Sequence, residues 1–325
     1  MTVYLVRRVL LFIPSLLIAS IAIFTAMRVL PGDVALVILG NNESPTGDNT
    51  ALLESYRQAL GLHDPLPVQY ARWMWSLVNG EFGGTSLIQH DPIGKIVLLR
   101  LPVTLELVIL TFILSWIISI PLGTLAAFQH NRWPDYLVRL VTIAGHAVPV
   151  FWAALLLLLI MSAVFSWTPP VFYTDLWVDP RSNLLKIIWP ALLLAWGFSA
   201  YLARVTRSSL LEVLRQDYIL AARSKGLTGR SVAVGHALRN ALIPVLTVGG
   251  LQIGALLGGT VILENIFGVP GIGQEIVLAA NSRDYPVIQS LAMLLVLLVL
   301  VLYLAIDVTY TIIDPRVRLA GGVRR

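Results

Sequence analysis

Four ionisable side chains in or beside long apolar stretches are the first candidates for chemistry. They are Glu106, His146, Glu264 and Asp307. Because an ionisable group is costly at membrane depth, each either serves the path of a solute or ion or is paired within the protein. For the three acids, which lie near the ends of their stretches, pairing or capping is the simpler interpretation. For His146, three residues before Pro149, a place on a solute path and a hydrogen bond between helices both stay open.

The sequence shows no catalytic constellation beyond these residues. Its five histidines have no HExxH or comparable metal-ligand spacing, and Ser208 and Ser209 have no histidine and acid in a familiar arrangement. Because the chain has no cysteine, thiolate metal sites and thiol catalysis are excluded. No GxxxxGK(S/T) phosphate loop occurs, and the glycines of residues 268–273 follow no strand, so they indicate a turn. We therefore expect a chain that hydrolyses no ATP and binds no metal or cofactor of its own.

Composition identifies the class of protein. Of 325 residues, 57% are hydrophobic and only 13% are charged, which is far more apolar than a soluble domain. A helix must offer about 20 largely apolar residues to cross a hydrocarbon core of roughly 30 Å. The net charge of +5 would suggest a basic face in a nucleic-acid binder, but in this setting it reports membrane topology. The sequence predicts an all-α polytopic membrane protein that contacts lipid and no nucleic acid.

Six apolar segments are long enough to cross the membrane. They cover approximately residues 9–27, 102–127, 136–165, 184–203, 241–262 and 286–306. The first is longer than the apolar core of a usual signal peptide and lacks a small-residue cleavage pattern before Arg28, so we interpret it as a retained helix. The third is long enough to be tilted, or bent near Pro149. Gly250, Gly254 and Gly258 form a small-residue stripe in the fifth, where another helix can approach closely.

Positive charge predicts the orientation of these segments. The short external loops hold only Arg181, Lys186 and Arg283. The cytoplasmic side would hold Arg7, Arg8, Arg132, Arg139, Arg204, Arg207, Arg215, Arg223, Lys225, Arg230, Arg239, Arg316, Arg318, Arg324 and Arg325. Because cytoplasmic loops carry the excess of lysine and arginine, both termini are expected in the cytoplasm.

Four regions follow from this layout. They are an N-terminal tail with the first transmembrane helix (1–30), an extracytoplasmic loop region (31–101), a core with helices two to six (102–313) and a cytoplasmic tail (314–325). The core includes a cytoplasmic loop at about 208–240. In the external region we expect a turn-rich start at 41–48, a helix at 51–60 and an aromatic helix at 68–78 that lies at the membrane surface. Another short helix is expected at 274–280.

A polar, basic insert at residues 218–248 separates the fourth and fifth apolar segments. It can form two helical pieces that break at Gly226, a residue type that suits a helix end with positive φ. The first piece brings small and basic side chains onto one face, which fits a groove in another protein because alanine permits close approach. These side chains are Tyr218, Ala221, Ala222 and Lys225. From composition alone, an ordinary basic cytoplasmic loop is the alternative.

The residue pattern of this insert resembles a known family. Residues 217–226, DYILAARSKG, and 236–244, HALRNALIP, resemble the coupling loop of ABC importer permeases of the dipeptide and oligopeptide family. The resemblance covers essentially the whole chain and is to the first permease subunit of that family. The other similar stretches are residues 4–8, 30–33, 60–62, 65–70, 101–107, 264–273 and 314–318. One departure is Leu220, which stands where the general importer motif has Glu.

The resemblance implies a type I ABC importer permease fold with six transmembrane helices, in the cytoplasmic (inner) membrane of a prokaryote. It implies two partner ATPase subunits, which would bind ATP and Mg and dock on the coupling helix. The coupling-helix residues would be Asp217, Tyr218, Ala221, Ala222, Arg223, Lys225 and Gly226. The other implied partners are a second homologous permease subunit, expected to form a heterodimer, and an extracytoplasmic solute-binding protein. The candidates to face that binding protein are Glu264, Phe267, Pro270 and Gly271.

The expected function is a permease subunit that forms half of a translocation path by alternating access. Peptides are the default cargo by resemblance, and nickel complexes, glutathione, haem and oligosaccharides stay open because related permeases carry them. His146 and the glycine stripe are the candidates for helix packing or for lining the pore. A self-sufficient channel or secondary transporter would be expected to show internal repeats or interrupted helices, and an intramembrane enzyme a catalytic constellation. Neither is evident in the sequence.

Overall fold

The computed structural model of the chain describes residues 2–29, 54, 57, 63–228 and 231–313. Within these residues the structure has helices, the loops that join them and one isolated bridge, between Thr85 and Pro92, but no strand. The chain divides into two compact units: unit 1 comprises residues 1–5, 104–269 and 301–325, and unit 2 comprises residues 6–103 and 270–300. The segments expected at 41–48 and 314–325, and all but two positions of the helix expected at 51–60, lie outside the described residues.

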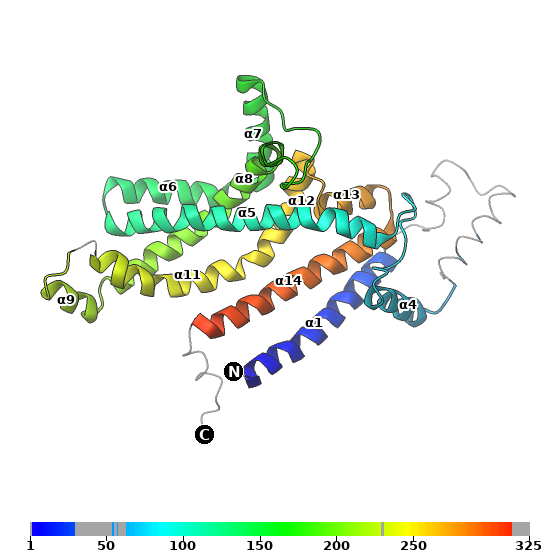
Figure 1. Ribbon diagram of the computed structural model, residues 1–325, viewed down its shortest axis with the longest axis horizontal. Helices are drawn as coiled ribbons and strands as arrows, with labels where there is room; N and C mark the ends of the chain where they lie inside the picture. Colours follow the sequence, from blue (N-terminus) through cyan, green and yellow to red (C-terminus); the bar gives the residue numbers. More distant parts are fainter. Residues whose placement is uncertain (1, 30–53, 55–56, 58–62, 229–230, 314–325) are drawn as a thin grey trace. The chain divides into compact units, whose positions relative to one another are not determined.

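The helices are labelled in Figure 1. In chain order they are α1 (Thr2–Val29), α4 (Leu66–Val78), α5 (Ile93–Phe128), α6 (Trp133–Ala147), α7 (Val150–Phe165), α8 (Pro180–Val213), α9 (Asp217–Ser224), the π-helix η1 (Val232–Leu238), α11 (Arg239–Leu251), α12 (Ile253–Phe267), α13 (Ile272–Asn281) and α14 (Tyr285–Ile313). The short helix expected at 274–280 is confirmed as α13.

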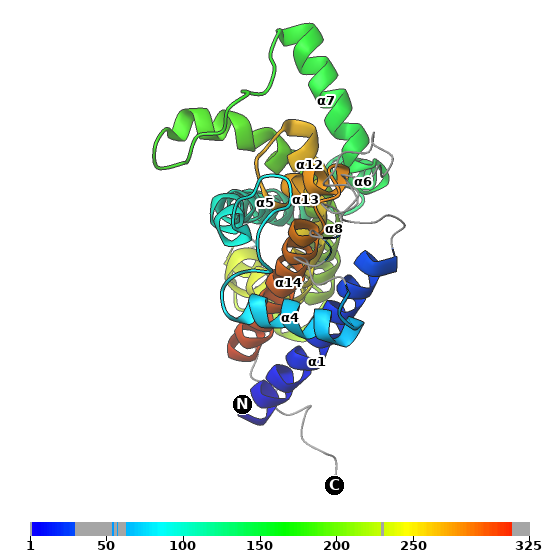
Figure 2. The ribbon, with the colours of Figure 1, turned by 90° about the vertical axis from the view of Figure 1, so that its right-hand side faces the viewer.

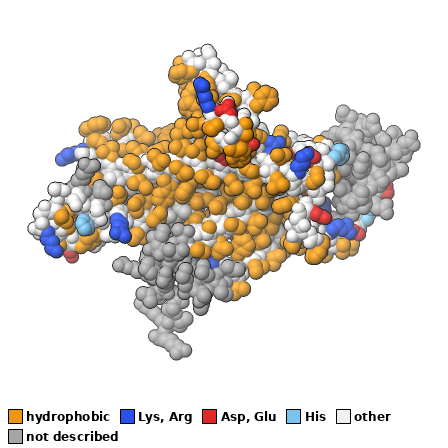
Figure 3. Space-filling model, viewed as in Figure 1, with side chains coloured by type: hydrophobic (Ala, Val, Ile, Leu, Met, Phe, Trp, Pro, Cys, Tyr) orange, Lys and Arg blue, Asp and Glu red, His pale blue; other side chains and the backbone are white. Residues whose placement is uncertain are grey.

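The apolar segments of the sequence correspond to candidate membrane spans. Four are single helices, Leu10–Val29, Ile93–Phe128, Pro180–Val213 and Tyr285–Ile306, and two are bent helix pairs. With each pair taken as one span, the described chain has up to six, in agreement with the sequence prediction. Figure 3 shows hydrophobic side chains over much of the visible surface of the described helices, as contact with lipid requires.

The third span bends at Pro149, as the sequence predicts. α6 and α7 meet there at an angle of 103°. A proline disfavours the helical conformation for the residue before it, and Val148 accordingly has an extended backbone with a ψ of 122°. Figures 1 and 2 show α7 turning away from the direction of α6.

The fifth span is interrupted as well, which the sequence did not predict. α11 and α12 meet at Gln252 with a bend of 47°. The bend follows the pair Gly249 and Gly250, and glycines are a common cause of helix kinks because they give a helix backbone the most freedom to depart from regular geometry. The π-helix η1 precedes α11, so the polar insert enters this span through irregular helical geometry.

Two helices extend beyond the apolar segments that predict them. α8 continues past Ala203, its expected end, to Val213. The arginines after Ala203 end the apolar run but favour helix, so the helix does not stop where the hydrophobicity does. α5 begins at Ile93 and runs through Pro102, so the boundary drawn at residue 101 falls inside a helix.

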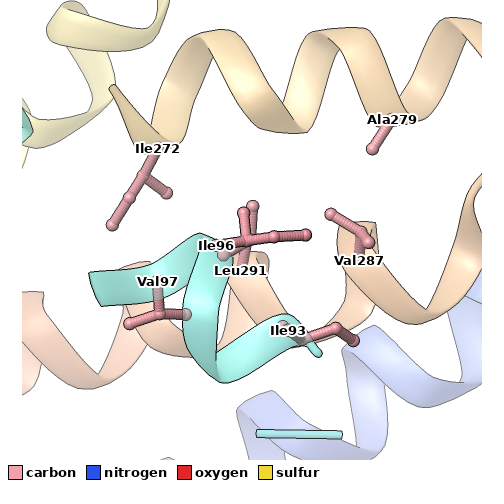
Figure 4. Packing of buried hydrophobic residues seen from close by; sticks show 7 residues of the cluster. All are labelled: Ile93, Ile96, Val97, Ile272, Ala279, Val287 and Leu291. Atoms are coloured by element: carbon pink, nitrogen blue, oxygen red, sulfur yellow. The ribbon is translucent and has the colours of Figure 1, made fainter. Parts of the chain in front are cut away.

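The start of α5 is helical because it forms the core of unit 2 together with α13 and α14 (Figure 4). The buried side chains of this core are Ile93, Ile96, Val97, Ile272, Ala279, Val287 and Leu291. The loop before α5 is tied to the start of α14 by Asp284, which accepts hydrogen bonds from the Ser86 hydroxyl at 2.5 Å and the Leu87 N–H at 3.3 Å.

The aromatic helix predicted at 68–78 is confirmed as α4. It packs on α1 through Tyr70 and Trp73, whose ring centroids lie 5.5 and 6.1 Å from that of Phe24. The Tyr70 hydroxyl is also hydrogen-bonded to Ser20 of α1 at 2.8 Å. Trp75 points out of this cluster with 67% of its surface exposed. Its position at the membrane surface stays a prediction.

Candidate functional site

α9 is a helix of 8 residues that links the end of α8 to η1 in unit 1 (Figure 1). It ends at Gly226 as predicted, and the φ of this glycine is +81°, in the left-handed region. The Leu227 N–H donates to the Ala222 carbonyl at 3.4 Å, a bond that is typical of a helix closed by a left-handed glycine. The glycine therefore fixes where α9 stops.

One side of α9 is buried. Ile219 has no exposed surface and packs in an apolar cluster beneath the helix, while Ala222 lies half-buried at the edge of this cluster. The other buried members are Ala127, Leu210, Val232, Ala237 and Ala241, which come from α5, α8, η1 and α11. A helix this short is marginal by itself in water, so its stability depends on this packing.

The other side of α9 is exposed. Tyr218 and Leu220 expose 43% and 53% of their surface, and Ala221 and Lys225 are exposed as well. For Arg223 the structure describes only the backbone. Large apolar side chains beside a small one, exposed on a short helix, form a surface that another protein can cover. The exposed side of α9 is therefore the candidate functional site.

Polar contacts add to the attachment of α9 and its neighbours. The Asn240 side-chain amide of α11 donates a hydrogen bond to the Tyr218 hydroxyl at 2.8 Å. The Ser209 hydroxyl of α8 donates to the Ala241 carbonyl of α11 at 2.9 Å. Because both bonds end on α11, the segments before and after the insert are held to one another as well as to α9.

A buried carboxylate joins the extension of α8 to α6. Asp135 has no exposed surface and accepts two hydrogen bonds from Arg139, at 3.1 and 2.7 Å, and two from Arg207, at 2.7 and 2.9 Å. The Asn131 N–H donates to it at 3.0 Å, and His130 Nδ1 lies 3.6 Å from it. Paired guanidinium–carboxylate bonds fix geometry as well as supplying energy. The turn between α5 and α6, the first turn of α6, and α8 thus meet at one group.

Sequence reasoning missed this group. It used Arg139 and Arg207 only as cytoplasmic charges, although Asp135 and Arg139 have the spacing of four that is typical of an ion pair on one helix. No local signal connects Asp135 to Arg207, which follows 72 positions later. That contact exists only because α6 packs on α8.

The predicted glycine stripe makes close helix contacts at two of its three positions. A Cβ added to Gly250 would collide with Ile306, and one added to Gly254 would collide with Tyr303, both of α14. Gly258 has no such neighbour within 4 Å among the described residues. Close approach of α14 therefore occurs at the first two glycines.

Two of the predicted acids are paired inside unit 1. Glu264, which is fully buried, accepts a hydrogen bond from the Thr104 hydroxyl at 2.8 Å, and Glu106 accepts one from the Tyr173 hydroxyl at 2.7 Å. Burial and the bond to Glu106 raise the pKa of Tyr173, so this phenol stays a donor at neutral pH. The predicted pairing is confirmed for both glutamates. The side chain of Asp307 lies outside the described part.

The candidates to face a binding protein differ in exposure. Glu264 and Phe267 of α12 are buried, with 0% and 3% of their surface exposed, and Gly271 is buried too. Pro270 is half-buried. Of the four, Pro270 is therefore the residue whose side chain has surface left for a partner.

His146 lies exposed in the last turn of α6. Within the described residues its imidazole has no hydrogen-bond partner, so the hydrogen bond between helices, one of the two alternatives, is not formed there. Instead it lines a hollow of unit 1 together with Tyr201 and Gln252. Of the two interpretations of His146, this placement favours contact with something outside the chain.

Comparison with protein families gives two matches that together cover most of the chain. Residues 119–319 match the family described as "Binding-protein-dependent transport system inner membrane component". Residues 1–108 match the N-terminal region of membrane components of the same transport systems.

Similar proteins are found in several bacteria. A putative peptide transport system permease protein of Brucella abortus (strain 2308) is 40% identical over 98% of this chain and 99% of its own length. The oligopeptide transport system permease protein AppB of Bacillus subtilis (strain 168) is 38% identical over 98% of this chain and 99% of its own length. The glutathione transport system permease protein GsiC of Salmonella paratyphi A is 38% identical over 97% of this chain and 98% of its own.

A solved structure shares the fold. A chain from the inward-facing MetNI methionine ABC transporter superposes with a TM-score of 0.50 and 17% sequence identity, over 74% of this chain and 97% of that one. At this identity the likeness concerns the fold alone, and it agrees with the arrangement that the sequence predicts.

Proposed function

Because the chain belongs to the family of inner membrane components of binding-protein-dependent transport systems, we propose that it forms half of the translocation path of an ATP-driven peptide importer. The relatives named for peptide and oligopeptide transport support peptides as cargo. Glutathione, the cargo named for a further relative, is itself a small peptide and falls in the same class. The family, the apolar spans and the relatives make the chain a multi-pass permease of the prokaryotic inner membrane.

The observation that carries the proposal is the construction of α9. Its buried side rests on four elements through Ile219, while its other side exposes Tyr218, Leu220 and Ala221. A short helix that is anchored firmly and left uncovered is suited to receive a force from a partner. The sequence contains no phosphate loop, so we assign that force to two partner ATPase subunits that bind ATP and Mg and dock on α9.

The force would pass from α9 into the spans through α8. This helix is continuous from Pro180 to Val213, so its cytoplasmic extension and its membrane part move together. Asp135 and Arg207 tie the extension to α6, and the cluster under α9 includes Ala127 at the end of α5. Docked ATPases would therefore move three helices at once, as alternation between inward- and outward-facing states requires.

The remaining partners follow from the family. We propose a second homologous permease as the other half of the path, and a binding protein outside the membrane that delivers the peptide. Of the four candidates to face the binding protein, Pro270 is the one that can contact it, while Glu264 and Phe267 are buried and support α12 from within. Both termini would lie in the cytoplasm with α9.

Co-purification from native membranes tests this proposal. The wild-type chain should bring two ATPases and a second permease with it. Ala221→Trp places a large side chain on the exposed side of α9 and should release the ATPases while the second permease stays bound. The matched control is Ala280→Trp on α13, another exposed alanine, which should keep the ATPases. A wild-type chain that comes alone, even after mild crosslinking, and transports solute by itself would overturn the importer assignment.

A further inference from the structure

A hollow of about 410 Å³ opens on unit 1 where α6, α8 and the junction of α11 and α12 come together. Its lining residues are Gly145, His146, Gly197, Phe198, Tyr201 and Gln252. A smaller cavity of about 180 Å³ shares Gly145, Gly197 and Phe198 with it and continues between α7, α8 and α12. The polar side chains of the hollow come from three different spans.

Two of the three polar side chains lie near the middle of their spans by residue count. His146 directly precedes the 103° bend between α6 and α7, and Gln252 stands at the 47° bend between α11 and α12. Tyr201 lies two residues before Ala203, where the apolar run of α8 ends. The two interruptions and the last turns of the apolar run of α8 therefore meet at one place, which the sequence could not show.

Most of the lining is apolar, but its imidazole and amide groups are unsuited to lipid. His146 is exposed, Tyr201 exposes 39% of its surface, and Gln252 is partly exposed. Within the described residues none of the three side chains has a hydrogen-bond partner. Unpaired imidazole and amide groups at this depth are disfavoured against hydrocarbon, so the hollow faces a wet path or a polar occupant.

The chemistry of the lining selects the kind of occupant. An imidazole, a phenol and a carboxamide all donate and accept hydrogen bonds, and no carboxylate lines the hollow. Phe198 supplies an apolar wall beside them. A group that offers both an N–H and a C=O, with apolar surface on either side, matches such a lining. The peptide bond is that group.

We propose that His146, Tyr201 and Gln252 form a transient contact site for the backbone amides of a peptide that crosses the membrane. The site rests on the proposed function and adds the part of the cargo that this chain contacts. Because every peptide presents the same backbone groups, contact here is independent of side-chain identity. It is also weak, since three neutral hydrogen bonds exchanged for those of water add little net free energy.

The test uses the complete assembly in proteoliposomes, with its ATPases, second permease and binding protein. Gln252→Leu and His146→Leu should each lower peptide uptake about three- to tenfold, the effect of one lost neutral hydrogen bond. ATP hydrolysis and the composition of the purified assembly should stay unchanged. The control is Thr247→Val on α11, whose hydroxyl bonds to its own helix at Ile243, and it should transport as wild type does.

A peptide with a modified backbone distinguishes the loss of a backbone contact from general damage to the transporter. A peptide with one N-methylated amide lacks an N–H donor, and wild type should transport it more slowly than the parent peptide. In Gln252→Leu the same methylation should cost less, because the partner of that N–H has already gone. Any preference of the binding protein is the same in both assemblies and cancels in this comparison.

Two results would overturn the site while leaving the importer intact. One is equal uptake by wild type and both variants, with the same methylation effect in each. The other is loss of the second permease from the Gln252→Leu or His146→Leu assemblies, which would make the hollow a packing surface between permeases. Failure of the proposed function has a different signature, because the wild-type chain would then purify without ATPases.

Discussion

At the scale of single residues, Asp135 shows how strongly context decides what a charge does. Asp91 and Lys95 form an ion pair with the same spacing of four, but both are exposed, at 41% and 58%. Asp135 has no exposed surface and holds two guanidiniums. Exposed pairs of this kind contribute little, whereas removing one partner of a buried pair leaves the other uncompensated.

The first prediction compares these two carboxylates. Asp135→Asn should lower the free energy of unfolding by about 2 kcal/mol, since hydrogen bonds to charged groups contribute about 1.5–3 kcal/mol. It should also reduce the peptide transported per ATP hydrolysed, because α8 would move without α6. Asp91→Asn should do neither. Thermal unfolding measures the stability of the two purified assemblies, and transport assays measure the peptide moved per ATP hydrolysed. Equal behaviour of the two variants would show that the ion pairs of Asp135 with Arg139 and Arg207 do not link α6 to α8.

Asp179 provides a pH test at the start of α8. Its carboxylate caps the helix, accepting hydrogen bonds from the Ser182 hydroxyl at 2.5 Å and from the Arg181 and Ser182 N–H groups. The Ser182 hydroxyl, followed by the Ser182 N–H, holds the pKa of Asp179 below its usual range. A lowered folded pKa means that the stabilisation is present at neutral pH and is lost as pH falls through that value.

The second prediction concerns Asp179→Asn, which keeps a capping oxygen but cannot titrate. Wild type should be more stable than the variant near pH 6, and the difference should hold until the pH nears the ordinary pKa of aspartate, about 3.9, and shrink below it. Melting temperatures of the purified assemblies across this range measure the difference. A gap that stays constant with pH would show that the charge of Asp179 contributes nothing to the cap.

At the scale of elements, the end of α9 is set by backbone conformation and its position by packing. Gly226 and Gly235 both have open space around a Cβ, yet only Gly226 has a positive φ. Ile219 and Leu220 are neighbours in one helix, yet the first is fully buried and the second is 53% exposed. The two glycines differ in backbone conformation, and the two aliphatic residues differ in burial, so each comparison tests one physical cause.

The third prediction uses the glycine pair. Gly226→Ala should destabilise the end of α9 by about 1–2 kcal/mol, because a side chain disfavours the left-handed conformation. Gly235→Ala should be neutral or should stabilise by up to about 1 kcal/mol, since glycine is a poor helix former. Hydrogen exchange of the α9 amides, compared between the two variants, measures the difference. Equal protection in both would contradict the conformational cause.

The fourth prediction uses the two neighbours on α9. Ile219→Ala should lower stability by about 2–4 kcal/mol through the cavity that it leaves in the cluster under the helix. Leu220→Ala should leave stability within about 0.5 kcal/mol of wild type and should weaken ATPase binding. Thermal unfolding and ATPase titration separate the two effects. A stable Leu220→Ala assembly with unchanged ATPase affinity would remove Leu220 from the docking surface.

At the scale of the whole molecule, the order of the spans determines which loops share a side of the membrane. With each bent pair taken as one span, the pair of α11 and α12 separates α9 from α13, so we expect these two helices on opposite sides of the membrane. The excess of positive charge around α9 predicts that this helix lies in the cytoplasm. The natural absence of cysteine provides a clean background for testing this assignment.

The fifth prediction introduces one cysteine at a time. Ser224→Cys on α9 should react with a membrane-impermeant maleimide only in inverted membrane vesicles. Asn281→Cys on α13 should react only in intact cells. Both side chains are exposed, so reactivity reports sidedness. Labelling of both positions from the same side would refute the six-span topology.

Features that depend on local pattern could be predicted from the order of the amino acids. Apolar runs located the spans, Pro149 located a bend, and Gly226 located the end of α9, because hydrophobicity and backbone preference act within a few residues. The resemblance of the insert to a coupling loop rested on the same short range; the family comparison confirms the family, and the role of the insert stays a prediction.

Contacts between distant residues could not be predicted in this way, because they depend on how the helices pack. Asp135 and Arg207 are 72 positions apart, and His146, Tyr201 and Gln252 come from three spans. Contacts like these depend on how each helix is rotated about its axis and where it bends. Side-chain packing along the whole helix determines both. The burial of Glu264 and Phe267 and the extension of α8 beyond its apolar run have the same origin. A hydrophobic pattern shows that a helix crosses the membrane, but neighbouring helices select the face that it turns toward them.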